Sequence, residues 1–553
     1  MTNKMQTLES YKQQQLDLLP IDMDEPVSLS NMENSKTNKR PSFKPYRQHQ
    51  INLLPIDLDE LISSSHMVRV INQAIEKMDL SPLMSRYEGG GAPAYNPVMM
   101  LKVVVYAYAD KTYSSRRIAK ATRENINYMW LTGNVQLDFM TINRFRSERL
   151  KGIIEDIFTE VVQLLIAEKY INYENYFLDG TKIEANANKY SYVWKKSTNQ
   201  YIENLREKVE AHLKEIDIIE ATEDAELGNE DLPETGNGRV INSAAIEEFA
   251  KKIDERLSEN PENKQLKAAK KAIEKDYLPR MEKYEKQLEI LGDRNSYSKT
   301  DTDATFMRMK EDDALKPGYN VQIGTENQFI VGFSVHQKPG DTTTLKEHME
   351  NLKEQMEGQV PENVIADAGY GSEENYEYLE GEKINGFVKY NTFHKETSSE
   401  WKNDPTRAQN FQYDAETDTY KCTAGQIFEF IREIQEKTEN GHMSTMREYE
   451  CKDCTGCEHR AKCVKSEKKS CNRRIIVNPR LNELRSQARE LLTSETGLEM
   501  RKKRSIEVES VFGNIKGNYG VRRFLLRGLE KVIIEWGLYS IGHNMRKLTV
   551  AMI

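Results

Sequence analysis

The first third of the chain repeats apolar residues at the spacing of an α-helix. Between residues 47 and 170 this period is clearest at Leu101–Tyr108 and Ile153–Leu165, where apolar side chains return every three to four positions. The pattern predicts an all-helical domain over residues 47–170. The residues before it, 1–46, are rich in Gln, Asn, Ser and Lys, and we expect them to form a flexible tail.

Short apolar runs of another kind appear further along the chain. Tyr176–Leu178 and Val364–Ala366 are each followed by Asp and then, close behind, by Gly, which is typical of buried central strands that open at a carboxyl end. Tyr319–Ile323 and Phe329–Val335 alternate as strands around a polar turn, and we expect them to form a hairpin. Helical spacing returns at residues 481–492, 500–516 and 529–548.

Two polar stretches interrupt these strands and helices. Residues 195–295 carry Leu and Ile at helical spacing around Glu215–Glu234, which holds nine acidic residues and no basic one, so we expect a helical insertion with an acidic loop. The second stretch, 395–474, contains all six cysteines. We therefore expect an α/β core that is interrupted twice, with its parts at residues 171–194, 296–394 and 475–553.

The distribution of charge along the chain says more about a nucleic-acid partner than the net charge does. The 553 residues are enough for about three or four domains, and the formal net charge of -9 by itself argues against a nucleic-acid partner. However, Lys and Arg outnumber Asp and Glu by six within residues 100–151, and by six again from residue 480 to the end. Acidic residues are in excess by six within residues 195–294. Two basic regions are thus concealed by acidic sequence elsewhere, and they favour binding to phosphate.

The apolar stretches of the chain do not predict a membrane protein. The longest, such as Pro97–Ala109, are short and include Lys102, and the first residues contain no apolar run. We therefore expect no membrane partner and no export.

Asp179 and Asp367 follow the two apolar strands, where open α/β sheets place functional groups. One such carboxylate is more readily explained as a turn or helix-capping residue. The order of elements changes this interpretation. The chain contains, in sequence, a strand with Asp, a hairpin, a second strand with Asp and a basic helix with Glu. A ribonuclease-H-like fold needs this order to hold two divalent metal ions with three carboxylates.

Several segments carry a likeness to a known family. They are FLDGTKIEANAN (177–188), TDTDATFMRMK with KPGYNVQIGTEN (300–327), VIADAGYGSEENYEYL (364–379) and the stretch from IEVESVFGNIKGNYG to NMRKL (506–548). These segments resemble bacterial insertion-sequence transposases with a DDE triad, and more narrowly the long branch that bears a cysteine-rich insertion. Residues 53–71, 93–122 and TINRFR (141–146) are similar to the N-terminal DNA-binding domain of that family.

The resemblance implies an enzyme that binds the inverted-repeat ends of its own element and then cuts and joins DNA. Its partners would be double-stranded DNA, as element ends and as target, and further copies of itself in a homodimer or larger synaptic assembly. Its location would be the bacterial cytoplasm, at the nucleoid. The alternatives are a metal-dependent nuclease of the same fold, which cuts without joining, and a transposase-derived DNA-binding protein.

Carried over to this chain, the resemblance implies Asp179, Asp367 and Glu509 as catalytic residues and as ligands of two Mg²⁺ or Mn²⁺ ions. Glu509 fits best as the third acid because Lys516 follows it at i+7, on the same face of a helix. Glu507 is the competing candidate. Arg504 stands one residue out of the family's register, so the basic partner on that side stays open. Asp301 and Asp303 are secondary candidates. Hard oxygen ligands suit these ions, which also neutralise the repulsion among three carboxylates.

Two Arg-rich helices, Ser114–Arg123 and Thr141–Arg149, are expected to be joined by a loop at Gly133 and to form a helix-turn-helix-like unit. An ordinary solvated basic face is the alternative. The predicted DNA contacts are Arg116, Arg117, Lys120, Arg144, Arg146, Arg149, Lys516, Arg522, Arg523 and Arg527.

The cysteines cluster between residues 422 and 471. Cys454, Cys457 and Cys463, with Cys422 upstream, predict a four-sulfur structural zinc site, and the resemblance implies the same four residues. Cys451 competes for one of these positions because it also forms a Cys-x2-Cys pair with Cys454. Reduced thiols and disulfides are the alternatives to zinc, although nothing in the sequence points to an oxidising compartment.

Overall fold

The structure is a computed structural model that describes residues 57–87, 94–227, 241–259, 261–438, 440–464 and 472–552. The predicted tail and the end of the acidic segment, residues 228–234, lie outside these ranges. From Leu58 onward the chain forms one compact unit. In the described ranges no helix combines the length and the apolar character that a membrane crossing requires.

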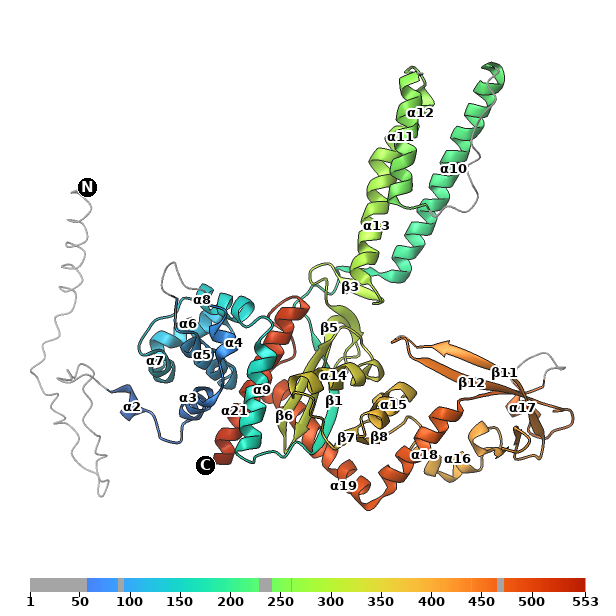
Figure 1. Cartoon of the computed structure of the whole chain (residues 1–553). Helices are drawn as coiled ribbons and strands as arrows, with labels where there is room; N and C mark the ends of the chain where they lie inside the picture. The colour runs from blue at the N-terminus through green and yellow to red at the C-terminus, as the bar shows by residue number, and fades with distance from the viewer. Residues whose placement is uncertain are drawn as a thin grey trace, which may run out of the picture. The chain divides into compact units, whose positions relative to one another are not determined.

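The described part of the region before residue 170 is helical, as predicted (Figure 1). Its helices are α2 (Leu58–Leu61), α3 (Met67–Lys77), α4 (Ser81–Met84), α5 (Pro97–Ala109), α6 (Ser115–Glu124), α7 (Ile126–Thr132), α8 (Phe139–Arg144), the π-turn η1 (Phe145–Arg149) and α9 (Ile154–Ala167). Helix α5 lies at the centre, because every residue from Met100 to Ala109 except Lys102 is buried. The Lys102 ammonium lies 2.6 Å from the Glu76 carboxylate on α3.

A mixed β-sheet follows the helical region. Its main strands are β1 (Asn175–Glu184), β5 (Leu315–Glu326), β6 (Phe329–His336), β7 (Asn363–Ala366) and β8 (Asn385–Val388), and β4 (Thr305–Arg308) pairs with the start of β5. Along the sheet the order is β6, β5, β1, β7, β8. The pairs β6–β5 and β5–β1 are antiparallel, whereas β1–β7 and β7–β8 are parallel. The predicted strands and hairpin are therefore present, and β1 is the central strand.

Successive residues of β1 point to opposite faces of the sheet. On one face the Tyr176 hydroxyl lies 2.6 Å from the imidazole of His348, on α14 (Leu345–Gln355). On the other face Phe177 packs in a cluster with Leu492 at the end of α18 (Pro479–Thr493) and Met500 on α19 (Glu495–Arg504). Asp179 has the parity of Phe177 and therefore belongs to the face that α19 covers.

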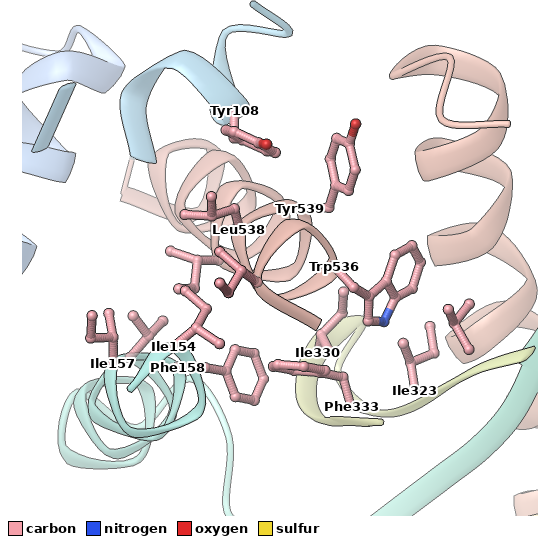
Figure 2. Close-up of a cluster of buried hydrophobic side chains, with 14 of the residues drawn as sticks. Tyr108, Ile154, Ile157, Phe158, Ile323, Ile330, Phe333, Trp536, Leu538 and Tyr539 are labelled. Carbon is pink, nitrogen blue, oxygen red and sulfur yellow. The ribbon is translucent and has the colours of Figure 1, made fainter. Parts of the chain in front are cut away.

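Helix α21 (Leu529–Met552) connects the helical region to the sheet through one continuous core. Figure 2 shows Tyr539 beside Tyr108 of α5, with ring centroids 4.9 Å apart. Phe158 of α9 meets Phe333 of β6 at the same distance. A side chain at Gly537 would fall 2.6 Å from Ile154, so only glycine permits α21 to approach α9 this closely.

The first insertion is helical, as expected. It contains α10 (Lys195–Leu227), α11 (Ser243–Glu259), α12 (Lys264–Ala272), the π-turn η2 (Ile273–Tyr277) and α13 (Leu278–Leu291). These helices have a small core of their own, with Leu205, Ile246 and Met281 among its members. The expectation of an acidic loop over Glu215–Glu234 was wrong for residues 215–227, whose backbone continues α10. Their spacing of Ile and Ala suits a helix despite the acidic residues between them.

The cysteine-containing stretch folds mainly as a second, antiparallel sheet, which the sequence pattern did not predict. Its strands are β9 (Gln412–Asp414), β10 (Thr419–Lys421), β11 (Ile427–Lys437), β12 (Met443–Cys451) and β13 (Arg474–Val477). The core behind it is small and includes Phe428, Tyr449 and Ile475. Because most residues of β11 are exposed and five of its eleven are charged, the strand lacks the apolar alternation that reveals strands in a sequence.

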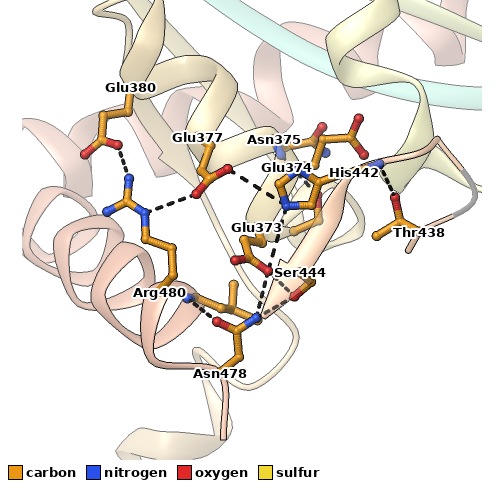
Figure 3. Close-up of polar contacts among 12 residues, drawn as sticks. Glu373, Glu374, Asn375, Glu377, Glu380, Thr438, His442, Ser444, Asn478 and Arg480 are labelled. Carbon is orange, nitrogen blue, oxygen red and sulfur yellow. Dashed lines mark hydrogen bonds and ion pairs between the residues drawn. The ribbon is translucent and has the colours of Figure 1, made fainter. Parts of the chain in front are cut away.

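Polar contacts attach this second sheet to α15 (Glu373–Gly381), the helix that follows the Asp367 loop (Figure 3). The buried carboxylate of Glu373 accepts hydrogen bonds from Ser444, at 2.5 Å, and from the Asn478 amide, at 2.7 Å. Arg480, at the start of α18, pairs with Glu377 at 3.1 Å and also with Glu380. The insertion is thus anchored next to one of the predicted catalytic loops.

Candidate active site

The pairing of β1 with β7 brings Asp179 and Asp367 to the same level. Phe177 pairs with Ile365, and two further residues along each parallel strand lead to Asp179 and Asp367. Alternation gives both carboxylates the face that α19 covers. Two acids 188 positions apart therefore become neighbours through strand register alone.

Arg504, the last residue of α19, connects the three predicted catalytic acids. Its guanidinium lies 3.1 Å from Asp179, 3.8 Å from Asp367 and 3.9 Å from Glu509. The exposed fraction of the three carboxylate side chains rises outward from 15% for Asp179 to 41% for Asp367 and 61% for Glu509, whereas that of Arg504 is 11%. The structure thus gathers the three acids around one largely buried cation.

A π-turn explains why Arg504 reaches this position. Residues Ser505–Glu509 form the turn η7, which has i to i+5 hydrogen bonding in place of i to i+4. The extra residue places Arg504 and Glu509, five positions apart, on one face of the helix. In the sequence, Arg504 lies one residue further from Glu509 than the family's spacing predicts. The wider π-turn accommodates this extra residue.

Backbone groups hold the two aspartates in place. The Asp179 carboxylate accepts a hydrogen bond of 2.8 Å from the amide of Gly180, and that of Asp367 accepts one of 2.7 Å from the amide of Gly369. Burial raises the pKa of Asp179 above its ordinary value, and the positive charge of Arg504 offsets part of this effect. Lys310 also lowers the pKa of Asp179.

We expect Asp179→Asn to stabilise the protein at neutral pH. A carboxyl group whose pKa is raised by folding favours the folded state when protonated and disfavours it when ionised, so the gain should be present at pH 7 and absent near pH 3. Urea unfolding at both pH values measures it. Asp312→Asn is the control with opposite sign, because a hydrogen bond from Lys316 lowers the pKa of Asp312. A lower urea midpoint for Asp179→Asn at pH 7 would show that the pair with Arg504 outweighs burial.

A fourth carboxylate, Asp341, lies close to Gly180 and Gly369, the glycines whose amides bind Asp179 and Asp367, and was missed in the sequence. It accepts hydrogen bonds from the side chains of Asn320, at 2.8 Å, and Gln322, at 3.1 Å. A Cβ atom at Gly180 would fall 2.8 Å from the Asp341 carboxylate and 2.3 Å from the Gln322 amide, so these two side chains pack directly against Gly180. Asp341 lies in the run Gly340–Thr344, which has the composition of an ordinary turn, and no sequence signal marks it.

The competing acids serve other parts of the structure. The buried carboxylate of Glu507 accepts a hydrogen bond of 2.6 Å from the backbone of Gln328, at the tip of the β5–β6 hairpin. Asp301 accepts hydrogen bonds from Tyr319 and the Gly528 amide, and Asp303 accepts one from the Leu529 amide. Asp301 and Asp303 thus hold the segment in which α21 begins.

The predicted basic residues near the C-terminus lie beside the second half of β1 and the residues directly after it. The Lys516 ammonium lies 3.3 Å from both the Lys182 carbonyl and the Glu311 carboxylate, and burial lowers its pKa. Arg523 and Arg527 donate to the carbonyls of Ala187 and Asn186. The side chains of Arg522, Arg523 and Arg527 are exposed.

Two sequence expectations about the helical region need correction. The segments around Arg116 and Arg144 are not joined by a simple loop, because α7 lies between them and Gly133 ends it in a left-handed conformation. Arg146 is not available to DNA. It is buried, and its guanidinium donates to the Tyr108 hydroxyl at 3.1 Å and the Tyr113 carbonyl at 2.7 Å. The sequence could not separate Arg146 from its exposed neighbours because a π-turn, η1, changes the helical phase there.

The other basic residues of this region are exposed. Arg116 lies over the ring of Phe139, at 5.2 Å from its centroid, and Lys120 pairs with Glu124 at 3.5 Å. Arg149 donates to the Arg86 carbonyl at 2.6 Å. Exposed side chains in this set are those of Arg116, Arg117, Lys120, Arg144 and Arg149. Helices α6 and α8, which carry the first four, contact each other.

Five cysteines line one small cavity beside the second sheet. They are Cys422, Cys451, Cys454, Cys457 and Cys463, all with free thiols, and the cavity has a volume of about 20 Å³. Burial and the neighbouring Cys454 thiol raise the pKa of Cys451 to about 12. The backbone amide of Gln426 donates to the Cys422 sulfur at 3.3 Å. Cys471 lies outside the described residues.

The described residues contain no group of three or more Asp, Glu, His or Cys side chains spaced to hold a metal ion. At the carboxylate site the guanidinium of Arg504 lies among the three acids. Their chemistry is nevertheless that of a hard-cation site, since all three donors are carboxylates.

The fold and site define an α/β protein in which three acids meet on one face of a mixed sheet, next to a helical region with exposed basic residues. Two family models match the chain. One, described as "Transposase DDE domain", matches residues 421–549, and one described as "Transposase domain" matches residues 56–148. The chain therefore contains two segments that match transposase family models, and these matches support the resemblance to insertion-sequence DDE transposases that the sequence indicated.

The matched ranges cover part of the site. Arg504, Glu509 and Lys516 fall within the DDE match, whereas Asp179 and Asp367 precede it. No match was found among curated proteins or among solved structures. DNA is the substrate that a transposase family implies, and the DDE domain indicates a DNA-cleaving enzyme.

Proposed function

We propose that the protein binds the terminal inverted repeats of its insertion element and catalyses metal-dependent DNA strand cleavage and strand transfer. The observation that carries the proposal is the convergence of Asp179, Asp367 and Glu509 on Arg504. The matches to transposase family models support the choice of DNA as substrate.

The same proposal classifies the core as ribonuclease-H-like. The sheet has three antiparallel strands followed by two parallel ones, with one acid on the central strand and one directly after its parallel neighbour, and this supports the assignment. It divides the core into parts at residues 171–194, 296–394 and 475–553, separated by the helical insertion and the cysteine-rich insertion.

In the proposed mechanism Asp179, Asp367 and Glu509 would hold two Mg²⁺ or Mn²⁺ ions. When bound, such ions activate a water or a 3′-hydroxyl and stabilise the leaving oxygen of an in-line displacement. The chain's own contribution is to position the acids. Strand register fixes Asp179 and Asp367, and backbone amides orient both carboxylates. Lys310 and Lys389, whose charges act on Asp179 and Asp367 respectively, would attract a DNA phosphate to the site.

One assay separates the proposal from its alternatives. Purified protein is incubated with Mg²⁺, labelled element ends and a target plasmid, and the products are resolved by size. Joined products are expected. Cleavage without joining would instead support a nuclease of the same fold, and a gel shift without cleavage would support a DNA-binding protein derived from a transposase.

The exposed arginines of α6 are proposed to contact DNA phosphates. Arg116→Gln with Arg117→Gln is expected to weaken binding to element ends and to reduce the slope of log K against log salt concentration by about two, one unit per lost contact. Fluorescence anisotropy over a salt series measures both effects. Lys283→Gln with Lys286→Gln, two exposed positions on the helical insertion, is the matched control. An unchanged salt slope in the Arg116 and Arg117 variant would contradict a DNA contact there.

The cysteine cavity is proposed to hold one structural zinc ion through Cys422, Cys454, Cys457 and Cys463. Its volume of about 20 Å³ leaves room for one small species among five thiols. Such an ion would fix the small core of the second sheet to the Cys454–Cys463 loop.

We expect the purified protein to contain one zinc ion per chain, measured by mass spectrometry of the metal. Cys454→Ser should remove it, and Cys471→Ser should not. Cys451→Ser decides the ambiguous ligand, because loss of zinc in that variant would place Cys451 in the set. Full reactivity of the thiols in native, zinc-free protein would support reduced cysteines instead.

We further propose that the protein acts in the bacterial cytoplasm at the nucleoid. Because a transposase must handle two element ends together, we also propose a homodimer or a larger synaptic assembly.

A further inference from the structure

A basic cavity lies beside the helix that carries Glu509, away from the carboxylate site. Its volume is about 360 Å³. Ser510, Asn514 and Asn518 line one wall at intervals of four residues and so share one side of the helical segment that follows Glu509. None of the three predicted catalytic acids lines the cavity. The site therefore shares a structural element with the candidate active site but not its residues.

Three cations from two distant parts of the chain meet at this cavity. Lys111 follows α5, whereas Arg546 and Lys547 lie near the end of α21. Among the described residues none of the three forms an ion pair. Two carboxylates, Asp110 and Glu507, act on Arg546 and Lys547 respectively through space, but neither lines the cavity.

Both of these carboxylates have other hydrogen-bond partners. Asp110 accepts from the Tyr128 hydroxyl at 3.2 Å, and Glu507 accepts from the Gln328 amide at 2.6 Å. The positive charge at the cavity wall is therefore not matched by a carboxylate within the cavity, and it favours an anion there.

The cations are held in position by the protein. Arg546 donates to the Ala109 carbonyl at 3.0 Å, and Lys547 donates to the Gln328 side chain at 3.4 Å. Lys111 and Arg546 also lie over the ring of Tyr519, at 5.6 Å and 5.8 Å from its centroid. Such preorganisation lowers the entropy that a ligand must lose on binding.

A buried, unpartnered ring nitrogen also points to a ligand. His543 lines the cavity, and only 3% of its surface is exposed. Its Nε2 lies 3.0 Å from the Gln328 carbonyl, whereas its Nδ1 is buried and has no hydrogen-bond partner among the described residues. Burial lowers the pKa of His543 to about 4, so the ring is neutral at pH 7 and, with Nε2 donating to the Gln328 carbonyl, Nδ1 is an acceptor. Buried polar atoms are almost always hydrogen-bonded, and a P–OH group or a water in the cavity can donate to this nitrogen.

We propose that this cavity binds a phosphate group. A phosphate offers several strong acceptor oxygens to the Lys and Arg side chains and to the amide groups of Asn514 and Asn518. The cavity is larger than one phosphate, so the group can belong to a DNA backbone or to a free phosphate compound. The proposal does not depend on catalysis at the carboxylate site.

The test titrates inorganic phosphate into the full-length protein at constant ionic strength, followed by calorimetry. Saturable binding is expected, and Lys111→Gln and Lys547→Gln should each weaken it at least about tenfold, through loss of a charge-assisted hydrogen bond. Lys531→Gln, an exposed position on the same helix as Lys547, should not change it. Asp367→Ala should bind phosphate like the wild type, which separates this inference from the proposed catalytic function.

A second arm identifies the source of the phosphate. If inorganic phosphate competes with labelled duplex DNA for the wild type but not for Lys547→Gln, the DNA backbone supplies the group. If duplex binding is the same in both proteins, a free phosphate compound is the ligand. Absence of saturation up to about 10 mM phosphate, or equal weakening in Lys531→Gln, would overturn the proposal.

Discussion

Asp367→Ala is expected to lower the rate of DNA strand cleavage by at least about a thousandfold, while binding to element ends persists. The substitution removes one of the three carboxylates that meet at Arg504, and with it a ligand for the ions that stabilise charge in the transition state. DNA binding should persist because the exposed arginines of α6 and α8 are unaffected. Single-turnover cleavage of a labelled end measures the rate, and anisotropy measures binding.

The matched control is Asp293→Ala, which removes an exposed carboxylate from the turn after α13. It should cleave at the wild-type rate. Full cleavage activity in Asp367→Ala would end the catalytic assignment, whatever the family models that match the chain. Loss of both cleavage and binding, with a lower unfolding midpoint, would indicate a folding defect, and Asp367→Asn, which preserves the acceptor for the Gly369 amide, then becomes the test.

Arg504→Met is expected to destabilise the metal-free protein by about 3 kcal/mol at pH 7, because it leaves the largely buried Asp179 without its cation. The loss should shrink near pH 3, where the carboxyl groups are protonated and need no counter-charge. Mg²⁺ should stabilise the variant more than the wild type, since bound cations replace the missing guanidinium. Urea unfolding with EDTA and with Mg²⁺ measures these differences.

Lys503→Met is the control, because Lys503 carries the same charge on the same helix but is exposed and pairs with Glu499. It should change the unfolding free energy little and should not alter the response to Mg²⁺. Equal stabilisation of wild type and Arg504→Met by Mg²⁺ would contradict the idea that Arg504 and the ions occupy the same electrostatic position.

Local patterns were sufficient to predict most elements of the core. The apolar runs that precede Asp179 and Asp367 are strands, and the residues that follow Tyr319 form the expected hairpin, because burial on both faces leaves continuous apolar sequence. The second sheet was not predicted because its strand β11 is mostly exposed and has no regular alternation of apolar and polar residues. Arg146 was misassigned because its exposure depends on which turn of the helix contacts Tyr108, which spacing alone does not show.

By itself, the sequence determined the helical and strand character of the core, the resemblance to a family and the identity of three candidate acids, since these depend on local periodicity and on short motifs. Only the tertiary structure decided that Asp179 and Asp367 stand level, that a π-turn brings Arg504 between them and Glu509, and that Asp341 lies beside Gly180 and Gly369. It also brought Lys111 to Arg546 and Lys547 across more than four hundred residues. The physical reason is that strand register, helix phase and domain packing are set by contacts between segments far apart in the chain.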